Sequence, residues 1–305
     1  MGKLNVKVFS KGLFSSWAYL RTFNMVFDCG EGCATELESV LPGIDKIFIT
    51  HTHGDHINGL PSLIGCRNTV AGTARRESGR AGSNKPLTIF YPKDNDRMQE
   101  TYDFLFPKRI GENWLNYKIN FTPIDNKFSL ELAKNVFVEP VEMLHQKDRS
   151  TYGYVIYEMR SRLKEKYRNA NIRELLTSGN VDKSDLNELY RYNKFAYLLD
   201  GYKILEPNKI RGCDDVIVDS TFLDEADRNK ETPNHFSATE ALRELNGCGV
   251  KNIFLAHISP RYWDTRIVGD VPFKERDNFV ANKYLSILSS VATFDMINPY
   301  KINLL

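Results

Sequence analysis

Short apolar runs alternate along the chain with segments in which apolar residues recur every three or four positions. The runs are rich in β-branched and aromatic residues, so we expect strands at 4–9, 25–28, 46–50, 87–91, 136–141, 154–157, 195–199, 216–219 and 253–256. Helices are expected between them at 33–40, 58–67, 96–105, 172–178 and 238–246. Strands that alternate with helices predict an α/β protein built in layers.

The helix expected at 238–246 has recognisable ends. Ser237 can act as the N-cap, Glu240 follows three residues later as in a capping box, and Gly247 follows the last apolar position. The stretch 158–194 interrupts the alternation, because it is long and charged. We expect this stretch to be a mostly helical insertion within a single domain that spans residues 1–305.

Composition describes an ordinary globular protein, with 42% hydrophobic and 26% charged residues. No apolar stretch has the length of a membrane span, and the N-terminus lacks the apolar segment of an export signal. The five cysteines are odd in number and form no CxxC pair, which is typical of reduced thiols. These features predict a cytoplasmic enzyme that has no membrane association.

The formal net charge is only +2, but basic residues gather in two stretches. In 67–85 they lie among Gly, Ser and Thr, in a stretch that looks too glycine-rich for a packed helix, whereas 160–173 contains six basic residues and one glutamate. Such segments can neutralise phosphates, although a solvated loop and a solvated helix face are equally consistent with them. The candidates for phosphate contacts are Arg75, Arg76, Arg80, Arg162, Lys164 and Lys166.

All six histidines fall where a two-metal hydrolase would need them. Three lie in the motif His51-Thr52-His53-Gly54-Asp55-His56, directly after an expected strand. His145 and His257 also follow expected strands, as does Asp200. In layered α/β proteins ligands gather at the carboxyl ends of strands, and imidazole with carboxylate suits Zn²⁺, or Mn²⁺ as a second choice.

The motif cannot be one face of a helix, so we expect it on a tight loop. His51, His53 and His145 would then bind one ion, and Asp55, His56 and His257 the other. Asp200 is the best candidate to bridge them. Two ions roughly 3.5 Å apart activate a shared water and stabilise the attacking and the leaving oxygen of an in-line displacement at phosphorus, which suits phosphodiester hydrolysis.

At these residues the chain resembles the metallo-β-lactamase superfamily and, within it, the ribonuclease Z family of tRNA 3′-end endonucleases. The likeness runs over most of the chain and includes the segments 27–32, 47–61, 164–167, 216–224, 234–237 and 256–262. It implies a four-layer αβ/βα sandwich and a homodimer. It also implies that Asp219 is the acidic partner of a catalytic His235, and that Ser259 and Arg261 lie in the last ligand motif, where we expect substrate contacts.

The resemblance has departures. Leu199-Asp200-Gly201 replaces the usual Gly-Asp-Thr, the glycine-rich opening is reduced to Ser10-Lys11-Gly12-Leu13-Phe14-Ser15-Ser16, and nothing matches the Gly-Pro tip of the arm that grips tRNA in some members. Once the ligands are assigned, His235 is the remaining histidine. It is therefore our candidate general acid for the leaving oxygen, with Asp55 and the ions serving the nucleophile.

Three functions remain open at this point. The first is an endonuclease that cleaves the 3′ trailer from precursor tRNA. The second is a phosphodiesterase for cyclic nucleotides, as in phage enzymes of this superfamily that degrade immune signals. The third is a non-catalytic RNA-binding protein on the same fold, although such a protein would not need seven metal-binding side chains.

Overall fold

Two large sheets dominate the computed structural model, which describes residues 4–78, 85–95, 97–105, 115–179, 181–228, 234–263, 295–297 and 302–305. In the first sheet the strand order is β15 (Asn303–Leu304), β1 (Val6–Lys11), β2 (Ser15–Leu20), β3 (Met25–Phe27), β4 (Lys46–Phe48), β5 (Leu87–Pro92), β6 (Ile119–Ile124). In the second the order is β11 (Lys203–Ile204), β8 (Val136–Leu144), β9 (Thr151–Leu163), β10 (Asn187–Leu198), β12 (Asp215–Asp219), β13 (Asn252–Ala256), β14 (Asp295–Met296), and β7 (Leu130–Ala133) pairs with β8.

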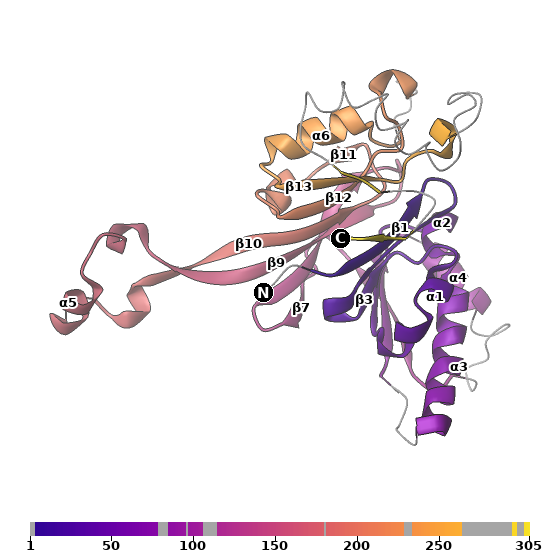
Figure 1. Cartoon of the computed structure of the whole chain (residues 1–305), viewed down its shortest axis with the longest axis horizontal. Helices are drawn as coiled ribbons and strands as arrows, with labels where there is room; N and C mark the ends of the chain where they lie inside the picture. Colours follow the sequence, from indigo (N-terminus) through magenta and orange to yellow (C-terminus); the bar gives the residue numbers. More distant parts are fainter. Residues whose placement is uncertain are drawn as a thin grey trace.

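Apolar side chains fill three layers of core. Between the sheets, residues such as Phe27 and Phe48 pack against Tyr154 and Phe195, and this interior is rich in stacked aromatic rings. A second cluster lies between the first sheet and its helices, and a third between the second sheet and α6 (Ala238–Gly247). The predicted sandwich of two sheets with helices outside is therefore confirmed (Figure 1).

Apart from a single helical turn at Gly54–Ile57, where a loop was expected, the helices follow the sequence prediction with two adjustments. Their bounds are α1 (Cys33–Glu36), α2 (Gly54–Ile57), α3 (Leu60–Ser78), α4 (Arg97–Leu105), α5 (Ile172–Thr177) and α6. The capping box at Ser237 and Glu240 is present. The first adjustment is that 33–40 is divided between α1 and a following 3₁₀ turn. Within the described residues no helix is long and apolar enough to cross a membrane.

The second adjustment concerns 67–85, which was expected not to form a packed helix. This expectation is wrong as far as Ser78, because α3 continues to that residue. Arg67 anchors this part of α3: its side chain is fully buried, donates to the carbonyl oxygens of Ile44 (3.0 Å) and Lys85 (2.7 Å), and stacks on Tyr117. Arg67 is thus part of the packing and is not exposed for phosphate contact.

The stretch 158–194 is not mostly helical, and that prediction is wrong. β9 and β10 run through both of its ends as an antiparallel pair, and among the described residues of this stretch the only helical elements are α5 and two 3₁₀ turns. Residues 159–163 of β9 pair only with 187–191 of β10, because β8 pairs with β9 no further than Glu158. At about 3.3 Å per residue, these five pairs extend the ribbon by about 17 Å. We call residues 159–191 the arm, and Figure 1 shows it projecting from the body.

Candidate metal centre

One edge of the sandwich collects the carboxyl ends of strands from both sheets. β10, β12 and β13 are parallel neighbours, and β8 runs in the same direction, so His145, Asp200 and His257 follow strands that end at this edge. β4 of the first sheet ends nearby and leads into the loop with His51 and His53, after which α2 carries Asp55 and His56. Side chains far apart in the sequence are thereby brought together.

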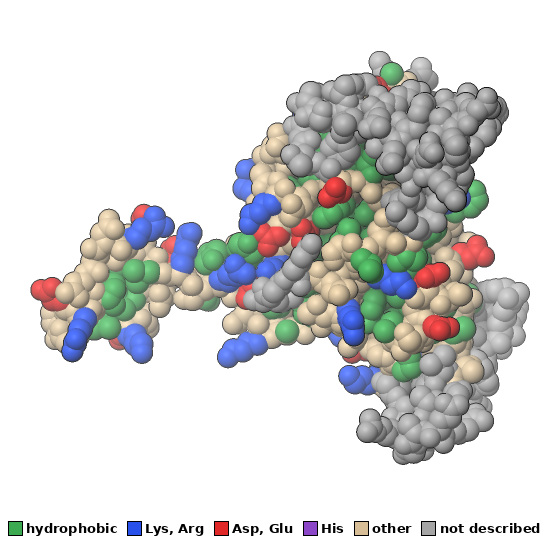
Figure 2. Space-filling view, viewed as in Figure 1, with side chains coloured by type: hydrophobic (Ala, Val, Ile, Leu, Met, Phe, Trp, Pro, Cys, Tyr) green, Lys and Arg blue, Asp and Glu red, His purple; other side chains and the backbone are tan. Residues whose placement is uncertain are grey.

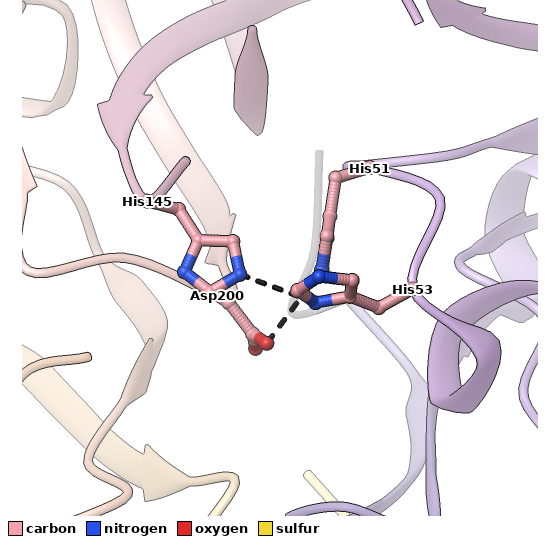
Figure 3. Close-up of side chains that lie close together, drawn as sticks. All are labelled: His51, His53, His145 and Asp200. Carbon is pink, nitrogen blue, oxygen red and sulfur yellow. Dashed lines mark hydrogen bonds and ion pairs between the residues drawn. The ribbon is translucent and has the colours of Figure 1, made fainter. Parts of the chain in front are cut away.

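Four of these residues form a first group of possible ligands: His51, His53, His145 and Asp200. One ligand atom from each lies within 4.8 Å of the others. His145 Nε2 is 3.3 Å from His53 Nδ1, and His51 Nε2 is 3.7 Å from Asp200 Oδ2 (Figure 3). The group combines three imidazoles with one carboxylate.

A second group consists of Asp55, His56, Asp200 and His257. His257 Nε2 lies 3.1 Å from Asp55 Oδ2 and 3.5 Å from Asp200 Oδ1, and His56 Nε2 lies 3.4 Å from Asp200 Oδ2. Asp200 therefore belongs to both groups: its Oδ2 faces His51 of the first group and His56 of the second, and its Oδ1 faces His257. This is the arrangement that a carboxylate shared by two ions requires.

In four of the histidines, Nδ1 forms a hydrogen bond with a neighbouring residue. The Nδ1 contacts are His51 to Thr50 Oγ1 (3.0 Å), His56 to Asp28 Oδ2 (2.7 Å), His145 to the Asn234 carbonyl (2.7 Å) and His257 to Thr221 Oγ1 (2.9 Å). Such partners fix the orientation of metal-binding imidazoles and leave Nε2 for the ion. The sequence alone indicated no role for Thr50, Asp28, Asn234 or Thr221, although all four lie in segments that carry the family resemblance.

Buried polar atoms without partners test whether the residues fit a metal. Among the described residues, His51 Nε2, His56 Nε2 and Asp200 Oδ1 are buried and have no hydrogen-bond partner. Buried polar atoms normally have a hydrogen-bond partner, so three that lack one at the same place indicate a ligand-binding site. Nitrogen and carboxylate donors of this kind suit divalent cations such as zinc or manganese, and the residues therefore fit such ions.

The electrostatics agree with this fit. Burial, with the charge of His56, holds the pKa of His51 well below its usual range, so the ring is neutral. Burial opposes ionisation of Asp200, but His257 and His56 outweigh it and hold its pKa well below the ordinary value. Burial likewise disfavours a charged His56, yet Asp200 and Asp28 raise its pKa well above the usual value. His51 can therefore offer a lone pair to a cation, and the ionised Asp200 provides the negative charge that stabilises one.

His235 lies beside these groups and pairs with Asp219. The distance from His235 Nδ1 to Asp219 Oδ2 is 2.7 Å, and the same carboxylate accepts hydrogen bonds from the backbone of Gly201 and from Thr221. Burial disfavours protonation of His235, but the charge and hydrogen bond of Asp219 outweigh it and raise its pKa to about 9. Arg228 also donates to the His235 carbonyl oxygen (3.2 Å). The side chain of His235 keeps 20% of its exposure, so it can reach a bound substrate.

The residues expected to contact substrate are spread over the molecule. Ser259 follows the His257 loop, and the exposed Arg261 donates to the Asp227 carbonyl and the Tyr262 hydroxyl. The remaining candidates lie on other elements: Arg75 and Arg76 are in α3, Arg80 lies outside the described residues, and Arg162, Lys164 and Lys166 lie on the arm.

Comparison with known proteins gives a consistent result. A family model described as a beta-lactamase superfamily domain matches residues 24–164. Ribonuclease Z of Staphylococcus haemolyticus is 39% identical over 107 residues, which cover 34% of this chain and only 30% of that protein. Ribonuclease Z of Oceanobacillus iheyensis is 27% identical over 259 residues, 78% of this chain and 79% of that protein.

The solved structure of the short form of human tRNase Z superimposes with a TM-score of 0.58 at 20% sequence identity, covering 84% of this chain and 93% of that one. At this level of identity the likeness concerns the fold. The family model, the sequence relatives and the two-sheet fold all agree, so the chain is similar to the metallo-β-lactamase superfamily and, within it, to ribonuclease Z proteins.

Proposed function

We propose that this chain is a metal-dependent endoribonuclease that removes the 3′ trailer from precursor tRNA. The observation that carries the proposal is Asp200, which is shared by two ligand groups and lies beside the His235–Asp219 pair. This arrangement suits phosphodiester hydrolysis, and the sequence relatives reported above are ribonuclease Z proteins. We propose that the whole chain is one catalytic domain.

The proposed ligands are His51, His53 and His145 at one position and Asp55, His56 and His257 at the other, with Asp200 between them. Zinc is the proposed metal, and manganese accepts the same donors. When bound, two such ions activate a water and neutralise charge on the phosphate.

The protein's own acid is proposed to be His235. A ribose oxygen leaves poorly as an alkoxide at neutral pH, so it needs a proton as its bond to phosphorus breaks. Asp219 keeps His235 protonated and holds its Nδ1, which leaves Nε2 to donate that proton. Asp55, which belongs to the second ligand group, is proposed to assist the nucleophile.

The arm favours a polynucleotide over a cyclic nucleotide, because so small a substrate needs no such extension. Lys and Arg side chains lie along the arm and where it meets the body (Figure 2). Between residues 164 and 186 there are five basic and four acidic residues, so the net charge there is only +1. We therefore propose that the phosphate contacts are made by three basic residues near the beginning of the arm: Arg162, Lys164 and Lys166.

The direct test is to incubate purified protein with a precursor tRNA that carries a 3′ trailer and, separately, with a panel of cyclic nucleotides. We expect one endonucleolytic cut just after the discriminator base, and none in mature tRNA. The variant Asp200→Ala serves as the inactive control. Hydrolysis of a cyclic nucleotide with no cleavage of the precursor would overturn the proposal.

We further propose that the enzyme acts in the cytoplasm, as its cysteine pattern and N-terminus predict, and that it is a homodimer, as the family resemblance implies. Light scattering on the full chain would measure the mass directly, and a monomer at assay concentrations would exclude the dimer.

A further inference from the structure

Gln146 contacts a proposed metal ligand and was not among the residues singled out in the sequence. It follows His145 in the loop after β8 and is half-buried. Its side-chain amide lies 2.6 Å from His53 Nε2. The opposite nitrogen of that ring, Nδ1, lies 3.3 Å from His145 Nε2 (Figure 3). His53 is therefore contacted at both nitrogens.

The hydrogen-bond partners fix where each proton lies in this arrangement. His145 Nδ1 faces the carbonyl oxygen of Asn234 at 2.7 Å, and a carbonyl only accepts, so His145 carries its proton on Nδ1. Its Nε2 is then an acceptor, and His53 Nδ1 donates to it. His53 Nε2 consequently has a free lone pair, which accepts from the amide NH₂ of Gln146.

His53 is a neutral ring with a choice of two tautomers. Its Nδ1 faces an acceptor and its Nε2 faces a donor, which is the pattern of a ring that carries one proton. A divalent cation held by the first ligand group needs a lone pair from His53. Gln146 covers Nε2, and Nδ1 is the nitrogen that faces His145, so Nδ1 must supply that lone pair.

We propose that Gln146 is a positioning residue that selects the His53 tautomer, and that its amide turns over when the first ligand group takes up a cation. With the proton moved to Nε2, His53 becomes a donor there, and Gln146 must present its oxygen. Glutamine can meet both demands, because its amide has a donor end and an acceptor end. The ring loses one proton and gains one, both exchanged with water, so its charge is unchanged.

This inference rests on the metal site of the proposed function, and its test measures the ring and the metal affinity. The nitrogen-15 shifts of His53 would be recorded in the chelator-stripped protein and again after zinc is added. Zinc affinity would be measured at fixed pH by competition with a chelator. The variants are Gln146→Met, which removes both ends of the amide, and Gln146→Glu, which leaves only an acceptor; Gln99→Met on the exposed face of α4 is the matched control.

We expect His53 of the natural protein to change from the Nδ1–H to the Nε2–H tautomer on zinc binding. Gln146→Met should weaken zinc binding about 10- to 100-fold, the usual effect of losing a partner of a metal-binding histidine, and Gln99→Met should not. Gln146→Glu should hold the Nε2–H tautomer before zinc is added.

An unchanged His53 tautomer in the natural protein, or a Gln146→Met affinity within about twofold of it, would overturn the assignment. So would tighter zinc binding by a Gln146→Glu variant whose His53 keeps the Nδ1–H tautomer before zinc is added, since that result reflects added charge alone. These outcomes are independent of whether precursor tRNA is cleaved, so the two proposals can fail separately.

Discussion

Asp219→Asn should slow cleavage of precursor tRNA at alkaline pH far more than at acidic pH. The natural carboxylate keeps His235 protonated up to a pKa of about 9, whereas an imidazole without such a partner titrates near 6.5. A raised pKa means that the acid is present below that pKa and is lost as the pH rises through it. The variant should therefore lose its acid at a lower pH than the natural enzyme.

The expected magnitude follows from these two values. At pH 8 an acid of pKa about 9 is about 90% protonated, and one of pKa 6.5 about 3%, so the variant should be about 30-fold slower. At pH 6 the protonated fractions are about 100% and about 76%, so only about a 1.3-fold loss comes from protonation.

The assay is single-turnover cleavage with enzyme in excess, measured from pH 6 to pH 9. The reference variant is His235→Ala, which should lose roughly 10²- to 10⁴-fold because the general acid is gone at every pH. Both variants should keep their metal content. A diester with a nitrophenolate leaving group needs no proton, so both should hydrolyse it at close to the natural rate.

Two results would refute the reasoning. If Asp219→Asn loses the same factor at pH 6 and at pH 8, Asp219 acts through structure and not by holding a proton on His235. If His235→Ala loses its metal, or loses the nitrophenyl and tRNA activities alike, His235 is a ligand or a structural residue.

Three further predictions concern other parts of the chain. Asp200→Ala should bind fewer than two metal ions per chain and lose phosphodiesterase activity, as metal analysis and cleavage assays would show; retained activity would contradict its shared role. Arg162→Gln, Lys164→Gln and Lys166→Gln together should raise KM for precursor tRNA and flatten its salt dependence, with turnover of a small diester nearly unchanged; equal loss on both substrates would instead indicate a folding defect. Arg67→Met should lower the thermal midpoint because it leaves the carbonyls of Ile44 and Lys85 without a donor, at about 1–3 kcal/mol for each unsatisfied group, while KM for tRNA stays the same; an unchanged midpoint would contradict the packing role.

Much of the fold could be predicted because its strands are short, apolar and bounded by polar residues. All nine expected strands are present, and the helix at Ala238–Gly247 has the predicted cap. The strands β2, β6, β7, β11, β14 and β15 were not expected. β2 begins with Ser15 and Ser16, whose polar side chains are buried through hydrogen bonds to the Glu31 carbonyl and to Ser10. The arm was missed because its exposed strands contain alternating charged residues, which read equally well as a charged helix until the pairing of 159–163 with 187–191 is known.

The sequence by itself determined the chemistry of the site, since five of the seven proposed ligands lie in two motifs, 51–56 and 256–262, and the other two directly follow apolar strands. It could not determine which atoms meet. Asp28 reaches His56, and Asn234 reaches His145, because strands of one sheet end at the same edge, and Gln146 reaches His53 because strands of the two sheets end together there. These contacts join residues 28, 89 and 93 positions apart, and such separations depend on sheet pairing and packing, which no local pattern encodes. The tertiary structure alone therefore decided how the histidines are oriented, which nitrogen each offers, and where the arm projects.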